Sequence, residues 1–78
     1  MKKLNTYETY IISCLAQGAN IGEVRKVLRY YGQKPNSESS VDKKLKELRK
    51  RFQCNTTIQL VYKLKNYVIP IAVVDIFK

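Results

Sequence analysis

The sequence contains no histidine and only two cysteines, Cys14 and Cys54. Two distant thiols, with no imidazole to complete a ligand set, do not make a metal site. The chain also has no carboxylate pair in an apolar setting and no glycine-rich phosphate loop, so the usual catalytic arrangements are missing. We therefore expect no enzymatic activity, no metal and no cofactor. Both cysteines lie within apolar patterns, which predicts small buried side chains in a reducing compartment, with a disulfide as the alternative.

Long apolar runs are absent as well. No stretch reaches the roughly 18 apolar residues that a membrane-spanning helix needs. The N-terminus begins with lysines, as a signal peptide does, but Asn5, Thr6, Glu8 and Thr9 interrupt the apolar core that such a peptide requires. We therefore expect a cytoplasmic protein with no membrane partner.

Acidic residues are scarce relative to basic ones. The chain of 78 residues has 6 acidic and 15 basic side chains, which gives a net charge of +9. This length allows one small domain with a thin core. The charge excess indicates a polyanionic partner, although ribosomal proteins, RNA binders and membrane-surface peptides share such a balance.

Helix-start signals occur four times along the chain. Each places a capping side chain three residues before an acid or amide, as in the capping box. The signals lie at residues 5–8, 20–23, 39–42 and 56–59. Only the last has the best-documented residue types, Thr followed by Gln. Apolar positions at helical spacing follow each signal, which predicts an all-α fold of four helices, over about 6–17, 21–30, 39–52 and 57–67.

The apolar spacing also predicts the core. Gly18 should end the first helix, and residues 31–38, rich in Gly, Pro, Asn and Ser, should form a loop. Outside the third helix, the side chains expected to face inward are Ile11, Ile12, Leu15, Ala16, Val24, Val27, Leu28, Ile58, Val61 and Leu64.

The third predicted helix has two faces of different character. One narrow stripe is apolar and consists of Val41, Leu45, Leu48 and Phe52. The opposite side carries Lys43, Lys46 and Lys50. A helix that packs with one face and presents lysines with the other suits insertion into a DNA groove. A solvated surface helix would show the same pattern.

Two segments carry a resemblance to a known family. Residues 4–8 read L-N-T-Y-E, and residues 15–28 read L-A-Q-G-A-N-I-G-E-V-R-K-V-L. In the second half, Ser40-Val41, Leu48, Arg51-Phe52 and residues 59–61 continue the pattern. Over about residues 4–64, the chain resembles the LuxR-type (GerE-like) helix-turn-helix domain, which reads roughly L-T-x-R-E…L-A-x-G-x-S-x-x-E-I-A…L and then T-V…I…K-L-x-V…Q-A-V.

The resemblance implies a DNA-binding domain, often dimeric, that inserts its third helix, about residues 40–52, into the major groove. Ser40 and Val41 match the Thr-Val that opens the recognition helix, which would put Ser40 near a phosphate. Lys44 takes the place of a histidine common in the family. The loop before the third helix is longer than the family's by roughly six residues, and it would hold Lys34 against the DNA backbone. Glu8 matches a mainly structural acid.

The second helix adds cations that could clamp phosphates, because this element crosses the DNA backbone in helix-turn-helix proteins. Solvated surface charge is the alternative for each. Arg49 lies on a flank of the third helix, and could reach a base or a phosphate. The candidate DNA-binding residues are Ser40, Lys43, Lys44, Lys46, Arg49, Lys50, Arg25, Lys26, Arg29 and Lys34.

The C-terminal residues 67–78 are the remaining feature, an apolar and nearly uncharged extension to the domain of residues 1–66. Such a patch either folds back on its own domain or pairs with a second copy or a partner regulator. The chain leaves no room for a sensor domain, which predicts a stand-alone transcriptional regulator that binds double-stranded DNA. The alternatives are a protein-interaction module, such as an anti-activator, and an architectural DNA binder without sequence preference.

Overall fold

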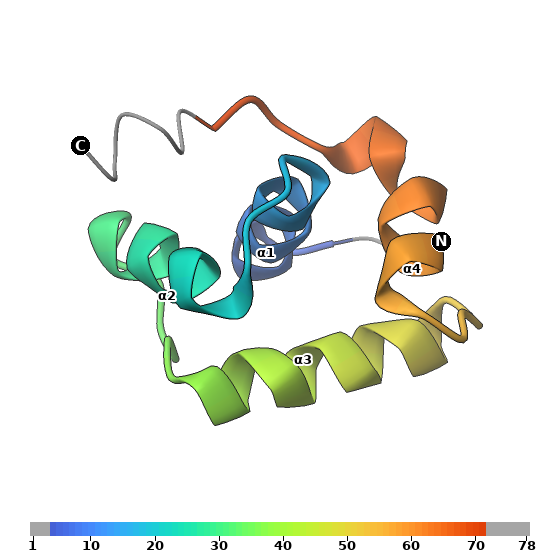
Figure 1. The fold of residues 1–78 in the computed structure, drawn as a ribbon, viewed down its shortest axis with the longest axis horizontal. Coiled ribbons are helices and arrows are strands. Elements are labelled where there is room, and N and C mark those ends of the chain that lie inside the picture. The colour runs from blue at the N-terminus through green and yellow to red at the C-terminus, as the bar shows by residue number, and fades with distance from the viewer. Residues whose placement is uncertain (1–3, 72–78) are drawn as a thin grey trace.

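Four α-helices and one short 3-10 helix make up the computed structural model, which describes residues 4–71. The elements in chain order are α1 (Thr6–Ala16), α2 (Ile21–Tyr30), α3 (Glu38–Arg51), α4 (Thr57–Lys63) and the 3-10 helix η1 (Lys65–Tyr67). The predicted all-α class and the number of helices are confirmed. In Figure 1, α1 runs through the middle of the molecule, α2 and α4 flank it, and α3 lies along one edge.

Side-chain caps fix where the helices begin. Asn5 and Asn20 each accept a hydrogen bond from the backbone N–H three residues on, and the glutamate at that position reaches back to the cap. Both are complete capping boxes, although neither has the Ser or Thr start that the motif prefers. At α4, Thr56 caps as predicted, but Gln59 Oε1 accepts from the Asn55 N–H instead of the Thr56 N–H.

Helix α3 begins earlier than the sequence predicts. The cap is Ser37, whose Oγ accepts from the Ser40 N–H at 3.2 Å, and Glu38 is the first helical residue. The predicted cap, Ser39, is therefore inside the helix. Serines 37, 39 and 40 offer the same capping chemistry, so the sequence alone did not separate them.

The first three helices share one way of ending. After each, a residue with positive φ lets two backbone N–H groups turn back to the carbonyls of the last turn, the Schellman arrangement. Gly18 (φ 87°) follows α1 as predicted, and Gly32 (φ 67°) follows α2. After α3 the same place is taken by Gln53 (φ 57°), a side chain in a conformation that favours glycine.

The core lies between the four helices and confirms most predicted positions. The apolar residues that are buried are Ile11, Ile12, Cys14, Val24, Val27, Leu28, Val41, Leu45, Leu48, Phe52, Cys54, Leu60, Leu64 and Ile71. Both cysteines are free thiols. Burial raises the pKa of Cys14 to about 11, which keeps this thiol protonated at neutral pH.

Two predicted core positions are wrong. Ala16 is exposed at the end of α1, and Ile58 is 84% exposed on α4. On α4 the inward stripe consists of Leu60 and Leu64, one turn apart. Ile58 and Leu60 are separated by about 200° around the helix, so they cannot face the same core. The predicted helix was also too long, because the α-helical part ends at Lys63 and η1 follows.

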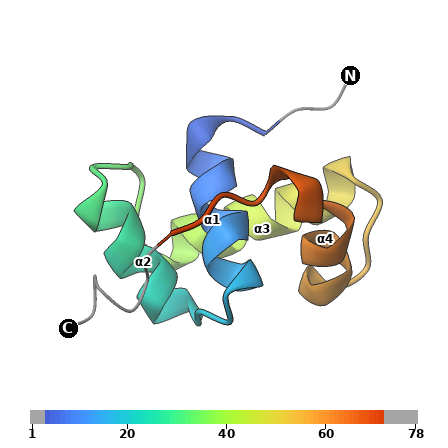
Figure 2. The ribbon, with the colours of Figure 1, turned by 90° about the horizontal axis from the view of Figure 1, so that it is seen from above.

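The chain after η1 returns across α1 (Figure 2). The Ile69 N–H donates to Ser13 Oγ at 2.9 Å, and Ile71 is buried in the core. Up to Ile71, the extension therefore folds back on its own domain, one of the two alternatives for this segment. The rest of the predicted extension, residues 72–78, lies outside the described residues.

Candidate nucleic-acid interface

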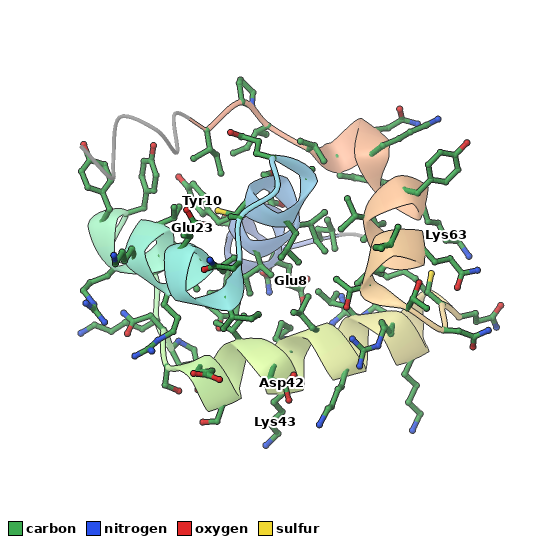
Figure 3. All side chains as sticks on the ribbon, viewed as in Figure 1. Glu8, Tyr10, Glu23, Asp42, Lys43 and Lys63 are labelled. Carbon is green, nitrogen blue, oxygen red and sulfur yellow. The ribbon has the colours of Figure 1, made fainter. Side chains whose placement is uncertain are left out.

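Helix α3 presents an outward face that is opposite to its core contacts. Lys43, Lys46 and Lys50 are exposed there, while Val41, Leu45, Leu48 and Phe52 are buried on the other side. Figure 3 shows Asp42 and Lys43 projecting away from the body of the molecule. We call Lys43, Lys46 and Lys50 the lysine ridge. The two faces of α3 thus lie as the sequence spacing predicts.

Asp42 partly offsets the charge of the lysine ridge. Its Oδ2 lies 3.2 Å from Lys46 Nζ, one turn along α3, and both side chains are more than half exposed. An exposed pair of this kind contributes only about 0.3–0.5 kcal/mol and is weakened by salt. Lys46 can therefore leave Asp42 for a stronger anion, but Asp42 remains a like charge beside any phosphate that approaches.

Lys44 points to the other side of α3, where it meets α1. Its Nζ lies 3.2 Å from Glu8 Oε2, and Arg51 donates to both oxygens of the same carboxylate, at 3.1 and 2.9 Å. The Glu8 side chain is only 2% exposed. Lys44 therefore forms an ion pair with Glu8 of its own fold, although the sequence predicted that it contacts DNA.

The environment of Glu8 keeps it ionised. Burial raises the pKa of this carboxyl, but hydrogen bonds from Arg51, from the Asn5 backbone N–H and from Lys44 outweigh that effect. The pKa of Glu8 therefore lies below its ordinary value. Because Lys44 lies in the middle of α3 and Arg51 at its C-terminal end, the buried Glu8 carboxylate ties α1 to both places and fixes which face of α3 points outward.

Two further candidate cations have partners within the fold. Arg49 Nη1 donates to Thr57 Oγ1 at 2.9 Å, which joins the end of α3 to the start of α4. Arg25 Nε donates to the Asn36 carbonyl at 3.2 Å and holds the loop between α2 and α3. These contacts position the two arginines in structural roles. Lys26 and Arg29 are exposed on α2 and lie off the lysine ridge.

A groove opens beside the first half of α3. Its volume is about 520 Å³, and the residues that line it are Asn5, Tyr7, Lys34, Pro35, Ser40, Lys43, Lys44 and Glu47. Lys34 thus reaches the start of α3 from the long loop. Ser40 also lines the groove, and its Oγ lies 2.7 Å from Ser37 Oγ. We call this space the lysine groove.

Tyr7 has an unusual position in the lysine groove. Its hydroxyl oxygen is buried, and it has no hydrogen-bond partner among the residues that the structure describes. Burial also raises the pKa of the phenol, so it remains a hydrogen-bond donor. A buried hydroxyl without a partner costs about 1–3 kcal/mol. No pattern in the sequence signals this feature, because it arises where α1 and α3 meet.

A second depression is apolar and lies between the end of α1 and α4. Leu15, Ala16, Thr57, Ile58, Val61, Tyr62 and Lys65 line it. Ile58 and Tyr62 are 84% and 70% exposed, and Lys65 Nζ lies 4.6 Å from the centre of the Tyr62 ring. Sequence reasoning missed this surface because it assigned Ile58 to the core.

Residues 4–71 contain no group of three or more side chains that could hold a metal ion. Over the same range, no helix is long and apolar enough to cross a membrane. Comparisons of the chain with models of protein families, with characterised proteins and with solved structures find no match. The resemblance to LuxR-type domains therefore stays a prediction.

Proposed function

We propose that this protein binds double-stranded DNA through the outward face of α3 and that it regulates transcription. The lysine ridge is the observation that carries the proposal. Lys43, Lys46 and Lys50 are exposed along one line of a helix whose opposite face is anchored in the core. The excess of basic over acidic residues in the whole chain adds attraction to a polyanion.

The shape of α3 suits the major groove. An α-helix with its side chains is about 10–12 Å wide, and the major groove of B-DNA is about 12 Å wide. In the fold, α3 lies at one edge of the molecule (Figure 1), so neighbouring helices do not stand in front of it. The LuxR-type resemblance assigns the same helix to the groove.

The chemistry of the ridge indicates how DNA would be held. Lysines attract phosphates and give a strong salt dependence without reading sequence. Base readout most often uses the bidentate groups of Arg, Asn or Gln, which the ridge lacks, whereas lysine can contact guanine. We therefore expect strong backbone attraction with modest specificity. The two buried free thiols suit a reducing compartment such as the cytoplasm.

Selection from a random pool of double-stranded DNA, followed by sequencing at two salt concentrations, tests this proposal. An enriched motif supports a sequence-specific regulator, and salt-sensitive binding without enrichment supports the architectural alternative. Lys46→Gln and Lys50→Gln should each weaken binding. Lys65→Gln is the control, because it removes the same charge from η1, away from α3. Absence of binding at low salt would contradict the proposal.

A protein-interaction module is the second candidate function. The exposed Ile58 and Tyr62 beside an apolar depression favour it, because adjacent exposed apolar side chains are typical of docking surfaces. On this alternative, Ile58→Ser would abolish partner binding, while Lys50→Gln would leave it unchanged. The DNA proposal predicts the reverse for DNA affinity, so the two variants separate the candidates.

A further inference from the structure

We propose that the apolar depression between α1 and α4 binds an amphipathic helix of another protein, in which apolar side chains are flanked by Asp or Glu. The inference rests on the second candidate function, the protein-interaction module, and names the chemistry of its partner. It is independent of DNA binding by α3, because the residues that line the depression come from α1, α4 and η1.

Apolar side chains of the depression lie open to solvent. Ile58 and Tyr62 are 84% and 70% exposed, and they are four residues apart, so they occupy one face of α4. Leu15 and Ala16 line the depression from the end of α1, and its volume is about 510 Å³. Neighbouring exposed apolar side chains are typical of interaction sites. The depression therefore offers a place for the apolar face of a partner.

The charges around the depression have one sign. Residues 48–71 contain five basic and no acidic side chains, and the α1 residues that line the depression are uncharged. Lys65 lines one end, and at the other end Arg49 donates to Thr57 Oγ1 at 2.9 Å. Lys65 forms no ion pair with any residue in 4–71. Cations at both ends of an apolar site favour a partner with acidic groups beside its apolar side chains.

The same charges disfavour a second copy as the occupant. Two copies docked through α4 would bring Arg49, Lys63 and Lys65 of one close to those of the other, and residues 48–71 contain no acid to pair with them. Like charges brought together at an interface oppose association. A partner of opposite charge avoids this repulsion, and the net charge of +9 speeds its approach.

The depression suits a helix rather than an extended strand. Extended peptides commonly bind by adding a strand to the edge of a sheet, and residues 4–71 contain no strand. Thr57 and Lys65, at the two ends of the depression, are separated by eight positions in the sequence, or roughly 12 Å along a helix. Two turns of a partner helix span this length. Apolar residues at i and i+4 of that helix would meet Ile58 and Tyr62.

Selection from a displayed library of helical peptides tests the inference. Each peptide has about 16 residues, because shorter isolated helices are marginal in water. Leu is fixed at i and i+4, and the flanking positions are randomised among Asp, Glu, Asn, Gln, Lys and Arg. Peptides that bind the Ile58→Ser protein are removed first, since a chain of net charge +9 attracts acidic peptides everywhere. Asp and Glu should then be enriched at the flanking positions of the peptides that the wild type binds.

Two lysine variants locate the charge effect. With a labelled peptide from this selection, Lys65→Gln should weaken binding about two- to fivefold at low salt, as expected for an exposed charge pair. Lys43→Gln is the matched control, because it removes the same charge from the outer face of α3, away from α4 (Figure 3). Fluorescence anisotropy measures both affinities. Equal losses in the two variants would overturn the inference, because the attraction would then depend on net charge alone.

Sedimentation velocity and DNA binding separate the remaining outcomes. If the wild type forms dimers that Ile58→Ser dissociates, a second copy covers the depression and the inference is overturned. If the bound peptides show no preference for flanking acids, the acidic partner is wrong, but the interaction module survives. If no peptide distinguishes the wild type from Ile58→Ser, both are overturned. In every case, the effect of Lys50→Gln on DNA affinity still decides the proposed DNA-binding function.

Discussion

Arg51 and Glu8 form a two-fold ion pair between α3 and α1, with Nη1 3.1 Å from Oε1 and Nη2 2.9 Å from Oε2. Lys44 binds the same carboxylate, at a position two turns earlier on α3. Because the two cations lie on one side of α3, their contact with Glu8 sets the rotation of this helix. The lysine ridge faces outward as a consequence, so a buried contact on α1 positions the proposed DNA surface.

Replacing Glu8 should therefore destabilise the fold. Glu8→Gln keeps a side chain that can complete the capping box, but it removes the charge that pairs Arg51 and Lys44. Removing one partner of a buried pair typically costs about 3–5 kcal/mol. We expect about 2–3 kcal/mol here, because both cations are roughly a quarter exposed and can reach water. Urea unfolding measures the change.

Glu23→Gln is the matched control for this variant. Glu23 holds the equivalent place in the capping box of α2, and it forms no ion pair with the residues in 4–71. We expect a change within about 0.5 kcal/mol. Equal losses in the two variants would show that capping, and not the ion pair, accounts for the role of Glu8.

The pKa of Glu8 predicts how stability depends on pH. The folded protein lowers this pKa below its ordinary value of 4.5, so the folded state favours the ionised form more than the unfolded chain does. The resulting stability is fully present above about pH 4.5 and is lost as the pH falls through the lower, folded pKa. The difference in stability between the wild type and Glu8→Gln should therefore shrink below pH 4.5. Thermal unfolding from pH 7 downwards tests this, and a constant difference would contradict it.

Gln53 is the one residue in 4–71 other than glycine with a positive φ. A residue with a Cβ costs roughly 1–2 kcal/mol at positive φ, and glycine avoids this cost. Glycine in turn loses about 0.5–1 kcal/mol, because it has more conformational freedom in the unfolded chain. Gln53→Gly should therefore stabilise the protein by about 0.5–1 kcal/mol, or several degrees in Tm. Gln53→Ala should give no such gain, because alanine keeps the strained Cβ. At the corresponding position after α1, Gly18→Ala should be destabilising.

The sequence predicts the local features of this fold well, because caps, apolar spacing and terminal glycines act over a few residues. The stripe of α3 and the end of α1 at Gly18 are examples. Contacts between distant residues were not predictable in the same way. Glu8 meets Lys44 and Arg51 across separations of 36 and 43 residues, and only the packing of α1 against α3 brings them together.

The candidate site likewise contains features that one helix determines, which the sequence predicts, and contacts between distant residues, which it does not. Spacing placed Lys43, Lys46 and Lys50 on one face correctly, since a single helix determines that face. The family resemblance, not the spacing, added Lys44 to the candidate DNA-binding residues, and in the structure Lys44 pairs with the buried Glu8 of α1. The groove beside Tyr7 is lined by residues from three segments of the chain. Neither the groove nor the buried Tyr7 hydroxyl could therefore be predicted from the sequence.

Substitutions on α4 test directly which side of this helix faces the core. Leu60 is fully buried, whereas Ile58 is 84% exposed. Leu60→Ala should cost about 2–4 kcal/mol through lost burial and the cavity it leaves. Ile58→Ser should change stability by no more than about 0.5 kcal/mol, as for other exposed positions. Comparable losses from the two substitutions, measured by urea unfolding, would favour the register predicted from the sequence.

Asp42 provides the sharpest test of where DNA approaches. This carboxylate stands next to the lysine ridge and pairs with Lys46 at 3.2 Å. DNA on this face must approach a like charge and compete for Lys46, so Asp42→Asn should raise the affinity. At low salt we expect an increase of about three- to tenfold, equivalent to about 0.7–1.4 kcal/mol. Fluorescence anisotropy with a labelled duplex measures the effect across a salt series.

Glu23→Gln again supplies the control, since it adds the same unit of net charge at the start of α2, away from the outer face of α3 (Figure 3). If DNA responds only to the total charge of the protein, both substitutions should raise affinity equally. If DNA lies on the lysine ridge, only Asp42→Asn should raise it substantially, because screening limits charge effects to about 10 Å at 0.1 M salt. The comparison therefore separates a defined contact surface from general attraction, and equal gains would count against α3 as the DNA-binding element.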